Sequence, residues 1–192
     1  MFAPYLVQTA TPLRLALGKV LLAPLVVGYK LGWLDPSLVR AIVIRFSLSG
    51  VSLAHLQACA VTFADRILPA TIRPEVLERL RWHQARGDTV VVVSGGREVA
   101  LAHWCAQHDV ELIGSRLKVR NGIATGRYLG AQCVREEKAR RVRERFDLHH
   151  FDTIHAYGDT PEDEAMLDLA HRRWYRGRER VATAQAVLDE AA

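Results

Sequence analysis

The sequence is poor in cysteine and has no long uncharged apolar run, and these scarcities exclude several classes of protein. The three cysteines, Cys59, Cys105 and Cys133, lie far apart and lack the paired spacing of zinc ligands. A disulfide framework is therefore excluded, and reduced thiols in the cytoplasm are expected. There is no internal repeat, no low-complexity segment and no signal-peptide cleavage pattern. What remains, 192 residues that are 49% hydrophobic and 24% charged, is typical of a globular domain with a modest subdomain.

Residues 13–33 form the most apolar part of the chain. Lys19 and Lys30 bracket an uncharged run of only about ten residues, whereas a helix that spans a membrane needs about twenty. We therefore predict that this segment is a buried or cleft-facing helix of a cap, and on this interpretation we expect no membrane partner. A helix that lies on a membrane surface is the alternative.

The chain carries 26 basic and 21 acidic residues, a net charge of +5. The excess falls late, in residues 135–145 and 172–180. In the first of these segments arginines alternate with glutamates, as on a solvated helix face, and no nucleic-acid-binding motif is present. We expect no nucleic-acid partner, and a mildly positive surface suits a small anionic phosphate ester.

The order of the predicted elements indicates an α/β protein. Residues 2 to about 70 are predicted to be helical, including a helix over 53–64 that Ser52 caps. Helices and strands then alternate: helix 75–86, strand 89–93, helix 97–107, strand 110–113, helix 135–146, strand 153–157, helix 161–170, a strand near 173–175 and a helix after Val181. This alternation predicts a doubly wound, mostly parallel sheet. The Asn121-Gly122 pair predicts an antiparallel hairpin over residues 116–127.

The most informative motif is Gly158-Asp159-Thr160-Pro161-Glu162-Asp163, which joins a predicted strand to a predicted helix. Gly158 allows a sharp turn at the carboxyl end of the strand, so Asp159 and Asp163 are expected to project from one crevice. Two carboxylates at such a point suit Mg²⁺. A simple helix cap is the alternative interpretation.

Two further features precede this motif in the chain. Residues 89–93 read as a buried strand that runs into Ser94, Gly95 and Gly96, and a helix is predicted from about Arg97. A hydroxyl and unobstructed amides there could cradle an anion, although an ordinary β-to-α turn has the same composition. Lys138 lies on the predicted helix 135–146. By itself it would be a solvated lysine beside two i,i+4 ion pairs, Glu136 with Arg140 and Glu137 with Arg141.

Taken in order, these motifs resemble the haloacid dehalogenase superfamily of phosphatases, in the branch typified by phosphoserine phosphatase. Val93–Gly96 resembles that branch's second motif, Lys138 its third, and Gly158–Leu167 its fourth. The resemblance implies a Rossmann-like core over residues 71–192 and a helical cap over residues 1–70. It also implies Mg²⁺-dependent hydrolysis of a small phosphorylated metabolite. Ser94 and the Gly95 amide would bind the phosphoryl group, Lys138 would neutralise its charge, Asp159 would bind the metal, and Asp163 would hold a metal-bound water or the lysine.

One departure from the family pattern concerns the nucleophile. The resemblance implies an Asp-x-Asp motif near the N-terminus, whose first aspartate attacks phosphorus, and this chain contains no Asp-x-Asp. We expect either that the native polypeptide starts earlier or that the chain is an inactive scaffold, binding a phosphorylated ligand or a protein partner. Whether this chain is an enzyme therefore stays open, as does its oligomeric state. Glu162 stands where phosphoserine phosphatases commonly have asparagine, so serine specificity is not carried over.

Histidines and tryptophans are assigned structural roles. His149, His150 and His155 are expected to be surface or core residues rather than metal ligands. Trp33, Trp82 and Trp104 are expected to be packing residues.

Overall fold

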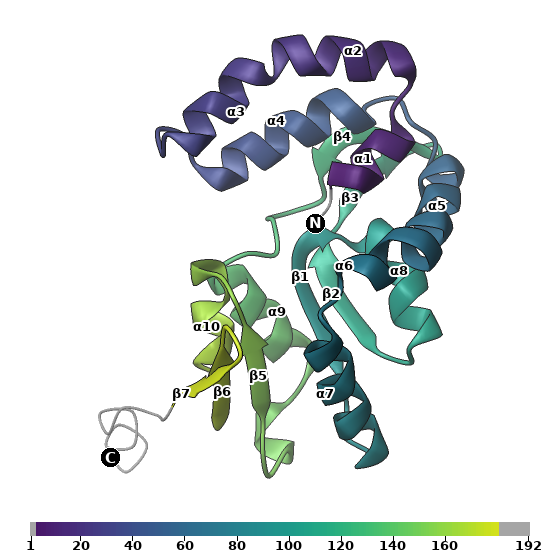
Figure 1. The fold of residues 1–192 in the computed structure, drawn as a ribbon. Coiled ribbons are helices and arrows are strands. Elements are labelled where there is room, and N and C mark those ends of the chain that lie inside the picture. The colour runs from purple at the N-terminus through teal and green to yellow at the C-terminus, as the bar shows by residue number, and fades with distance from the viewer. Residues whose placement is uncertain (1–2, 181–192) are drawn as a thin grey trace. The chain divides into compact units, whose positions relative to one another are not determined.

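The computed structural model describes residues 3–180, which divide into two compact units (Figure 1). The first unit is Met1–Gln132 and the second is Cys133–Ala192. This division follows the contacts within the chain. The predicted division into a cap over residues 1–70 and a core over residues 71–192 stays a prediction.

The first third of the chain is helical, as predicted. Its helices, each given with its bounds, are α1 Ala3–Thr9, α2 Pro12–Leu21, α3 Ala23–Lys30, α4 Pro36–Leu48, α5 Leu53–Thr62, the π-helical turn η1 Phe63–Ile67 and α6 Leu68–Thr71. Thr11, Asp35 and Ser52 cap α2, α4 and α5, because each side chain accepts a hydrogen bond from a backbone N–H of the first turn. The predicted cap at Ser52 is thereby confirmed.

The rest of the first unit contains two helices and two pairs of strands. They are α7 Pro74–Ala85, β1 Val91–Arg97, α8 Glu98–Gln107, β2 Glu111–Ser115, β3 Leu117–Arg120 and β4 Ile123–Tyr128. Strands β1 and β2 pair in parallel, and β3 and β4 form an antiparallel hairpin. Asn121 and Gly122 both have positive φ angles, 50° and 75°, as the predicted two-residue turn requires. The hairpin prediction is therefore confirmed.

The core of the first unit lies where α1, α5, η1 and α8 meet. Tyr5 and Phe63 are fully buried there in an edge-to-face pair with ring centroids 5.5 Å apart. The Tyr5 hydroxyl donates to the Leu56 carbonyl at 2.9 Å, which satisfies the one polar atom of that side chain. A second cluster joins α4 to β4. It depends on Gly126, because a Cβ at this position would lie 2.9 Å from the carbonyl oxygen of Arg45.

For residues 13–33 we predicted a buried or cleft-facing helix; a single buried helix is wrong, and the cleft-facing role stays a prediction. The segment folds into two helices, α2 and α3, with Pro24 in the first turn of α3. They form an outer layer on α4 (Figure 1), and Trp33 is 78% exposed, so its predicted packing role is also wrong. The small residue Gly18 faces inward against Phe46, which leaves larger apolar residues outside. Among residues 3–180, no single helix has the length and hydropathy of a membrane span; Pro12–Gly18 and Ala23–Lys30 meet those criteria only together, across a 49° bend.

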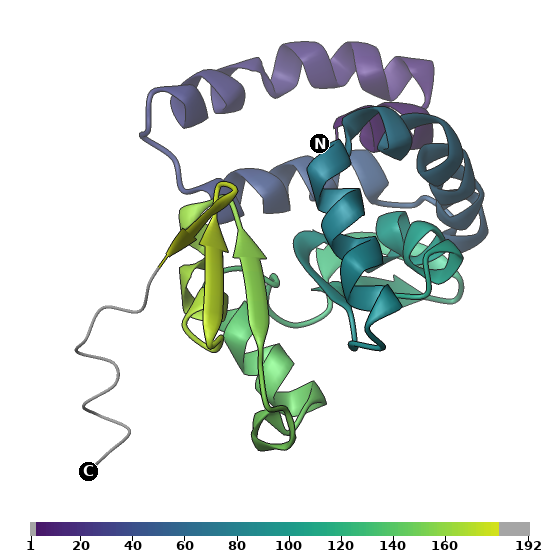
Figure 2. The same cartoon turned by 60° about the horizontal axis from the view of Figure 1, so that its bottom comes forward.

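The second unit has a small sheet and two α-helices within the described residues. Its elements are α9 Glu136–Arg145, the 3-10 turn η2 Leu148–His150, β5 His155–Gly158, the 3-10 turn η3 Pro161–Asp163, α10 Glu164–Leu167, β6 Arg172–Tyr175 and β7 Arg178–Arg180. Figure 2 shows the three strands side by side, with β5 parallel to β6 and β7 antiparallel to it. The helix predicted over 161–170 is instead η3 and a single turn of α10. Strand β7 was not predicted, and the helix predicted after Val181 lies outside the described residues.

The parallel pairs β1–β2 and β5–β6, with helices between the strands of each pair, agree with the predicted α/β class. The strands of residues 3–180 are nevertheless hydrogen-bonded as three separate sheets rather than as one continuous sheet. Within this part of the chain, β1 pairs only with β2 and β5 only with β6.

Candidate active site

Ser94 lies in a bulge of β1. Ser94 is opposite Gly114 of β2, whereas Arg97 is opposite Ser115, so Gly95 and Gly96 are the extra residues on β1. The Gly96 N–H donates to Ser94 Oγ at 3.0 Å, and the buried Ser115 hydroxyl donates to the Gly95 carbonyl at 3.1 Å. Because Ser94 Oγ accepts the Gly96 bond, its own proton can be donated to a phosphoryl oxygen.

This arrangement changes one detail of the prediction. The glycines lie within β1, and the helix that follows begins at Glu98 rather than at Arg97. The Gly96 amide is bonded to Ser94, so it does not form part of an anion cradle at a helix N-terminus. The role predicted for the Gly95 amide stays a prediction.

Arg97 is a buried cation that the sequence reasoning missed. It is 5% exposed, and its guanidinium lies 5.3 Å from the ring centroid of Tyr5. Burial lowers the pKa of Arg97. Since arginine is usually a surface residue, nothing in the local sequence signals this burial.

Lys138 and Asp163 form a buried ion pair in the second unit. Each residue is 6% exposed, and Lys138 Nζ donates to Asp163 Oδ1. The other carboxylate oxygen, Oδ2, accepts three hydrogen bonds, from the Asp159 N–H at 3.1 Å, the Thr160 N–H at 2.9 Å and the Thr160 hydroxyl at 2.8 Å. Burial acts to raise the pKa of Asp163, but the Lys138 ammonium and the Thr160 donors outweigh it, so the pKa lies below its ordinary value.

Gly158 allows Asp163 to reach these partners. A Cβ at Gly158 would lie 2.6 Å from the Asp163 Cβ and 3.2 Å from its Cγ, so any larger residue would displace the carboxylate. The loop that follows leaves Asp159 exposed. Arg176 holds this loop from the β6–β7 turn, because its N–H donates to the Gly158 carbonyl at 2.8 Å and its Nε to the Asp159 carbonyl at 3.1 Å. The sequence offered no sign of that contact.

Arg135 joins the start of α9 to the same loop. Its N–H donates to the Glu162 carbonyl at 2.9 Å, and its backbone is at φ 53°, ψ −129°, which residues other than glycine rarely adopt. Such strain costs of order 1–3 kcal/mol and persists where the surrounding structure enforces it. Here it sets the position of α9, and therefore of Lys138, relative to Asp163.

The acidic residues of the second unit fit a magnesium ion better than a zinc ion. Within residues 3–180 there is no group of three or more His, Cys, Asp or Glu side chains that could hold a metal. Mg²⁺ is commonly bound through one or two carboxylates, with waters and phosphate oxygens completing its octahedral shell. The exposed Asp159 suits direct ligation, whereas both oxygens of Asp163 already accept hydrogen bonds from the protein.

His149 and His150 are exposed and His155 is half-buried, and their lack of a metal-binding role stays a prediction. His150 contacts Asp147 at 2.9 Å on the surface, and the His155 ring stacks on Trp174 with centroids 5.4 Å apart.

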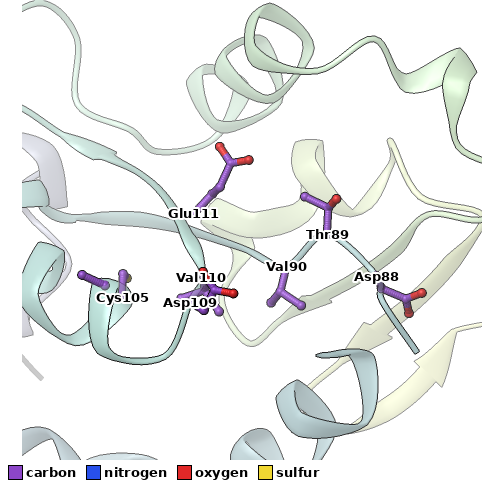
Figure 3. A pocket seen from close by; sticks show the side chains of 8 residues that line it. Asp88, Thr89, Val90, Cys105, Asp109, Val110 and Glu111 are labelled. Carbon is purple, nitrogen blue, oxygen red and sulfur yellow. The ribbon is translucent and has the colours of Figure 1, made fainter. Parts of the chain in front are cut away.

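The first unit has a cavity of about 340 Å³ (Figure 3), and none of the predicted site residues lines it. It is lined by Asp88, Thr89, Glu111 and their neighbours, at the amino ends of β1 and β2. Active sites in parallel sheets lie at the carboxyl ends of the strands, where Ser94 is found. Because this cavity lies at the amino ends instead, it is not the candidate active site.

The second unit therefore brings together three of the predicted residues, Lys138, Asp159 and Asp163. Ser94 and Gly95 belong to the first unit.

Several known proteins are similar to this chain in sequence and in fold. A family model described as haloacid dehalogenase-like hydrolase matches residues 5–168. Protein CicA of Caulobacter vibrioides is 30% identical over 177 residues, covering 91% of this chain and 78% of that protein. A protein of unknown function from Bordetella pertussis Tohama I has a similar structure, with a TM-score of 0.77 at 23% identity, over 90% of this chain and 79% of that one. A structure described as a probable phosphoserine phosphatase from Vibrio cholerae matches with a TM-score of 0.63 at 19% identity, over 90% of this chain and 51% of that one.

Proposed function

Because the chain belongs to the haloacid dehalogenase-like hydrolases, we propose that it binds a small phosphorylated metabolite with Mg²⁺ in the manner of the aspartate-nucleophile phosphatases. The observation that carries this proposal is the buried Lys138–Asp163 pair beside the exposed Asp159. A buried ammonium that is held by one carboxylate is a fixed positive charge, which suits the charge of a phosphoryl group.

Each predicted residue then has a defined role. Asp159 would hold Mg²⁺, and the metal would neutralise charge on the phosphoryl oxygens. Asp163 fixes Lys138 and can accept a hydrogen bond from a metal-bound water. Ser94 donates its hydroxyl proton to a phosphoryl oxygen, with help from the Gly95 amide. Such sites act mainly through positioning and charge neutralisation.

The nucleophile decides how fast this chain can turn over a substrate. In the family it resembles, an aspartate of an Asp-x-Asp motif attacks phosphorus, and these 192 residues contain no Asp-x-Asp. We therefore propose that this chain binds a phosphoryl group but hydrolyses esters slowly. The same observation favours a second candidate function, an inactive scaffold that binds a phosphorylated ligand.

Metal binding tests the proposal without requiring activity. Mn²⁺ can replace Mg²⁺ and is detected by electron paramagnetic resonance. We expect Asp159→Asn to weaken Mn²⁺ binding at least tenfold, or about 1.4 kcal/mol, because it removes the direct carboxylate ligand. The matched control is Asp152→Asn, an exposed carboxylate ahead of β5, which should bind Mn²⁺ as the wild type does. Equal Mn²⁺ binding by wild type and Asp159→Asn would refute the assignment of Asp159.

Hydrolysis of p-nitrophenyl phosphate then separates the two candidates. We expect Mg²⁺-dependent turnover close to background, together with Mg²⁺-dependent binding of inorganic phosphate that Ser94→Ala weakens. Slow turnover that Asp159→Asn abolishes favours the impaired enzyme, and phosphate binding with no turnover favours the scaffold. Rapid turnover abolished by Asp159→Asn would show that another group of this chain attacks phosphorus. Absence of phosphate binding would contradict both functions.

A further inference from the structure

Helices α2 and α3, with the turn that follows them, expose an unusual number of large apolar side chains. Leu13, Val20 and Trp33 are 70%, 73% and 78% exposed. Nine large apolar side chains are exposed in this segment: Leu13, Leu17, Val20, Leu21, Val26, Val27, Tyr29, Leu31 and Trp33. Single exposed apolar residues are normal, but a contiguous set of this kind marks a surface that binds something. We call these nine residues the apolar surface.

The apolar residues of α2 face outward in a regular stripe. Leu13, Leu17 and Val20 follow the i, i+4, i+7 spacing of one helix face. The opposite side of the helix contacts α4, where Gly18 packs on Phe46 and the Arg14 guanidinium donates to the Ser47 carbonyl at 3.3 Å. The fold therefore turns a cation toward the protein and leucine and valine toward the outside, the reverse of an ordinary surface helix.

The charge of this segment points to an anionic partner. The first 34 residues contain no aspartate or glutamate, and besides Arg14, whose guanidinium bonds to Ser47, they carry the basic residues Lys19 and Lys30. The Lys30 side chain is exposed. The first acidic residue, Asp35, caps α4 and so follows the apolar surface. A surface that combines aliphatic side chains with basic charge complements anionic lipid headgroups above an acyl layer.

The position of the aromatic residues supports a bilayer rather than another protein. Tyr29 and Trp33 lie at the end of α3 and in the turn after it, beside Lys30. Tyrosine and tryptophan, with an apolar ring and one polar atom, are favoured at the boundary between headgroups and acyl chains.

We propose that α2 and α3 dock on the surface of an anionic phospholipid bilayer. Leu13, Leu17 and Val20 enter the outer acyl layer, and Tyr29 and Trp33 lie at headgroup level. The two helices lie in the plane of the interface and do not span it, since each is too short. This inference does not depend on the proposed phosphatase site, which uses none of these residues.

Vesicle flotation of the full chain tests the docking. The vesicles contain equal parts of dioleoylphosphatidylcholine and dioleoylphosphatidylglycerol, and a second set contains phosphatidylcholine alone. We expect the wild type to float with the anionic vesicles, to bind the neutral ones more weakly, and to be partly released by salt. The double variant Leu17→Glu/Val20→Glu should lower the partition coefficient at least tenfold.

A matched control separates this surface from general hydrophobicity. Val61→Glu/Val76→Glu introduces the same two charges at exposed valines of α5 and α7 and should bind vesicles as the wild type does. The tryptophan emission of the wild type should shift to shorter wavelength on binding, and Trp33→Phe should remove most of that shift. Thermal melts confirm that each variant is folded.

Two results would overturn the inference. One is equal vesicle binding by Leu17→Glu/Val20→Glu and the wild type. The other is a lack of vesicle binding with self-association in sedimentation that Leu17→Glu/Val20→Glu abolishes, since the surface would then bind a second copy of the chain. Neither result alters the Mn²⁺ binding of Asp159, so failure of the docking is distinguishable from failure of the proposed function.

Discussion

The Lys138 ammonium is fixed by a carboxylate that is itself held by three other donors. Taking two charges out of water is costly, and their attraction offsets that cost only when hydrogen bonds satisfy the remaining polar atoms. Asp163 meets this condition because Thr160 and the Asp159 N–H occupy its second oxygen. The pair therefore orients Lys138 firmly. Removing one partner would leave the other charge buried and unpaired, which destabilises the fold.

We predict that Lys138→Met destabilises the protein by about 3 kcal/mol, because it leaves the Asp163 carboxylate buried without its cation. The double variant Lys138→Met/Asp163→Asn should recover part of that loss. The measurement is urea unfolding followed by circular dichroism. The control is Arg180→Met, which breaks an exposed pair with Glu164 at 2.8 Å and should cost less than about 1 kcal/mol. A loss no larger for Lys138→Met than for Arg180→Met would contradict the prediction.

The Glu137 carboxylate makes the stability of α9 depend on pH in the acid range. Arg140 contacts both of its carboxylate oxygens at 2.7 Å, and Arg141 contacts one of them at 2.7 Å. The expected pair with Arg141 is confirmed, but Arg140 pairs with Glu137 and Glu144 instead of Glu136. The hydrogen bond from Arg140, followed by Arg141, lowers the pKa of Glu137 to about 2.

A lowered folded-state pKa fixes the sign of the pH effect. The stability that Glu137 contributes is fully present above its unfolded pKa, about 4.3, and is lost as pH falls toward about 2. We predict that Glu137→Gln reduces the slope of unfolding free energy against pH in that window. Urea unfolding at a series of pH values measures the slope. Glu136→Gln, one position earlier and exposed, is the control, and an equal change in both variants would argue against the assignment.

At the scale of single elements, the turn after β5 requires glycine at position 158, because even the methyl group of alanine would not fit there. Gly158 ends β5, and the Asp163 side chain packs directly over it. The turn, the capping contacts from Thr160 and the Lys138 ion pair all require this close approach.

We predict that Gly158→Ala destabilises the second unit by about 1–3 kcal/mol, because its Cβ would collide with the Asp163 Cβ. It should also weaken Mn²⁺ binding, since the Asp159 loop must move. The control is Gly177→Ala, which has a positive φ of 77° but open space at its Cβ. That variant costs about 1 kcal/mol from backbone strain and should leave Mn²⁺ binding unchanged. Unaltered metal binding in Gly158→Ala would show that the loop tolerates the methyl group.

The sequence predicted those helices and strands that are determined by neighbouring residues in the chain. The run of valines specified β1, the Asn121-Gly122 pair specified the hairpin, and Ser52 specified the start of α5. Elements that depend on distant partners were missed. Strand β7 is stabilised by its pairing with β6, a partner that its own short sequence does not reveal. Likewise, which face of α2 is exposed depends on which face contacts α4.

Among the residues of the candidate site, too, those in one short motif could be predicted from the sequence, and those that depend on distant contacts could not. Asp159 and Asp163 could be found because one short motif places both at a strand end. Arg135 and Arg176 could not, since each reaches the loop through backbone pairing that no local pattern encodes. Composition likewise identified residues 13–33 as apolar, but an apolar composition alone does not say whether the side chains are covered.

At the scale of the whole molecule, the described residues of the two units form buried clusters of very different size. Eleven buried residues form the main cluster of the first unit, among them Tyr5, Phe63 and Trp104. Among the described residues of the second unit, 133–180, the corresponding cluster contains Ala156, Leu167 and Ala170. Because stability grows with buried apolar area, the second unit should open more easily than the first.

Hydrogen exchange followed by mass spectrometry at increasing urea can detect this difference. We predict that peptides from β5 and β6 become exchangeable at lower urea than peptides from β1 and β2. Two matched truncations test the assignment of each core: Leu167→Ala, at a residue 1% exposed, and Leu101→Ala, at a residue 6% exposed. Each should cost about 2–5 kcal/mol. Leu167→Ala should lower the protection of β5 and β6 while β1 and β2 keep theirs, because its contacts lie within the second unit. If all four strands lose protection at one urea concentration in the wild type and in Leu167→Ala, the chain unfolds as a single cooperative unit, and the separate stability of the second unit is rejected.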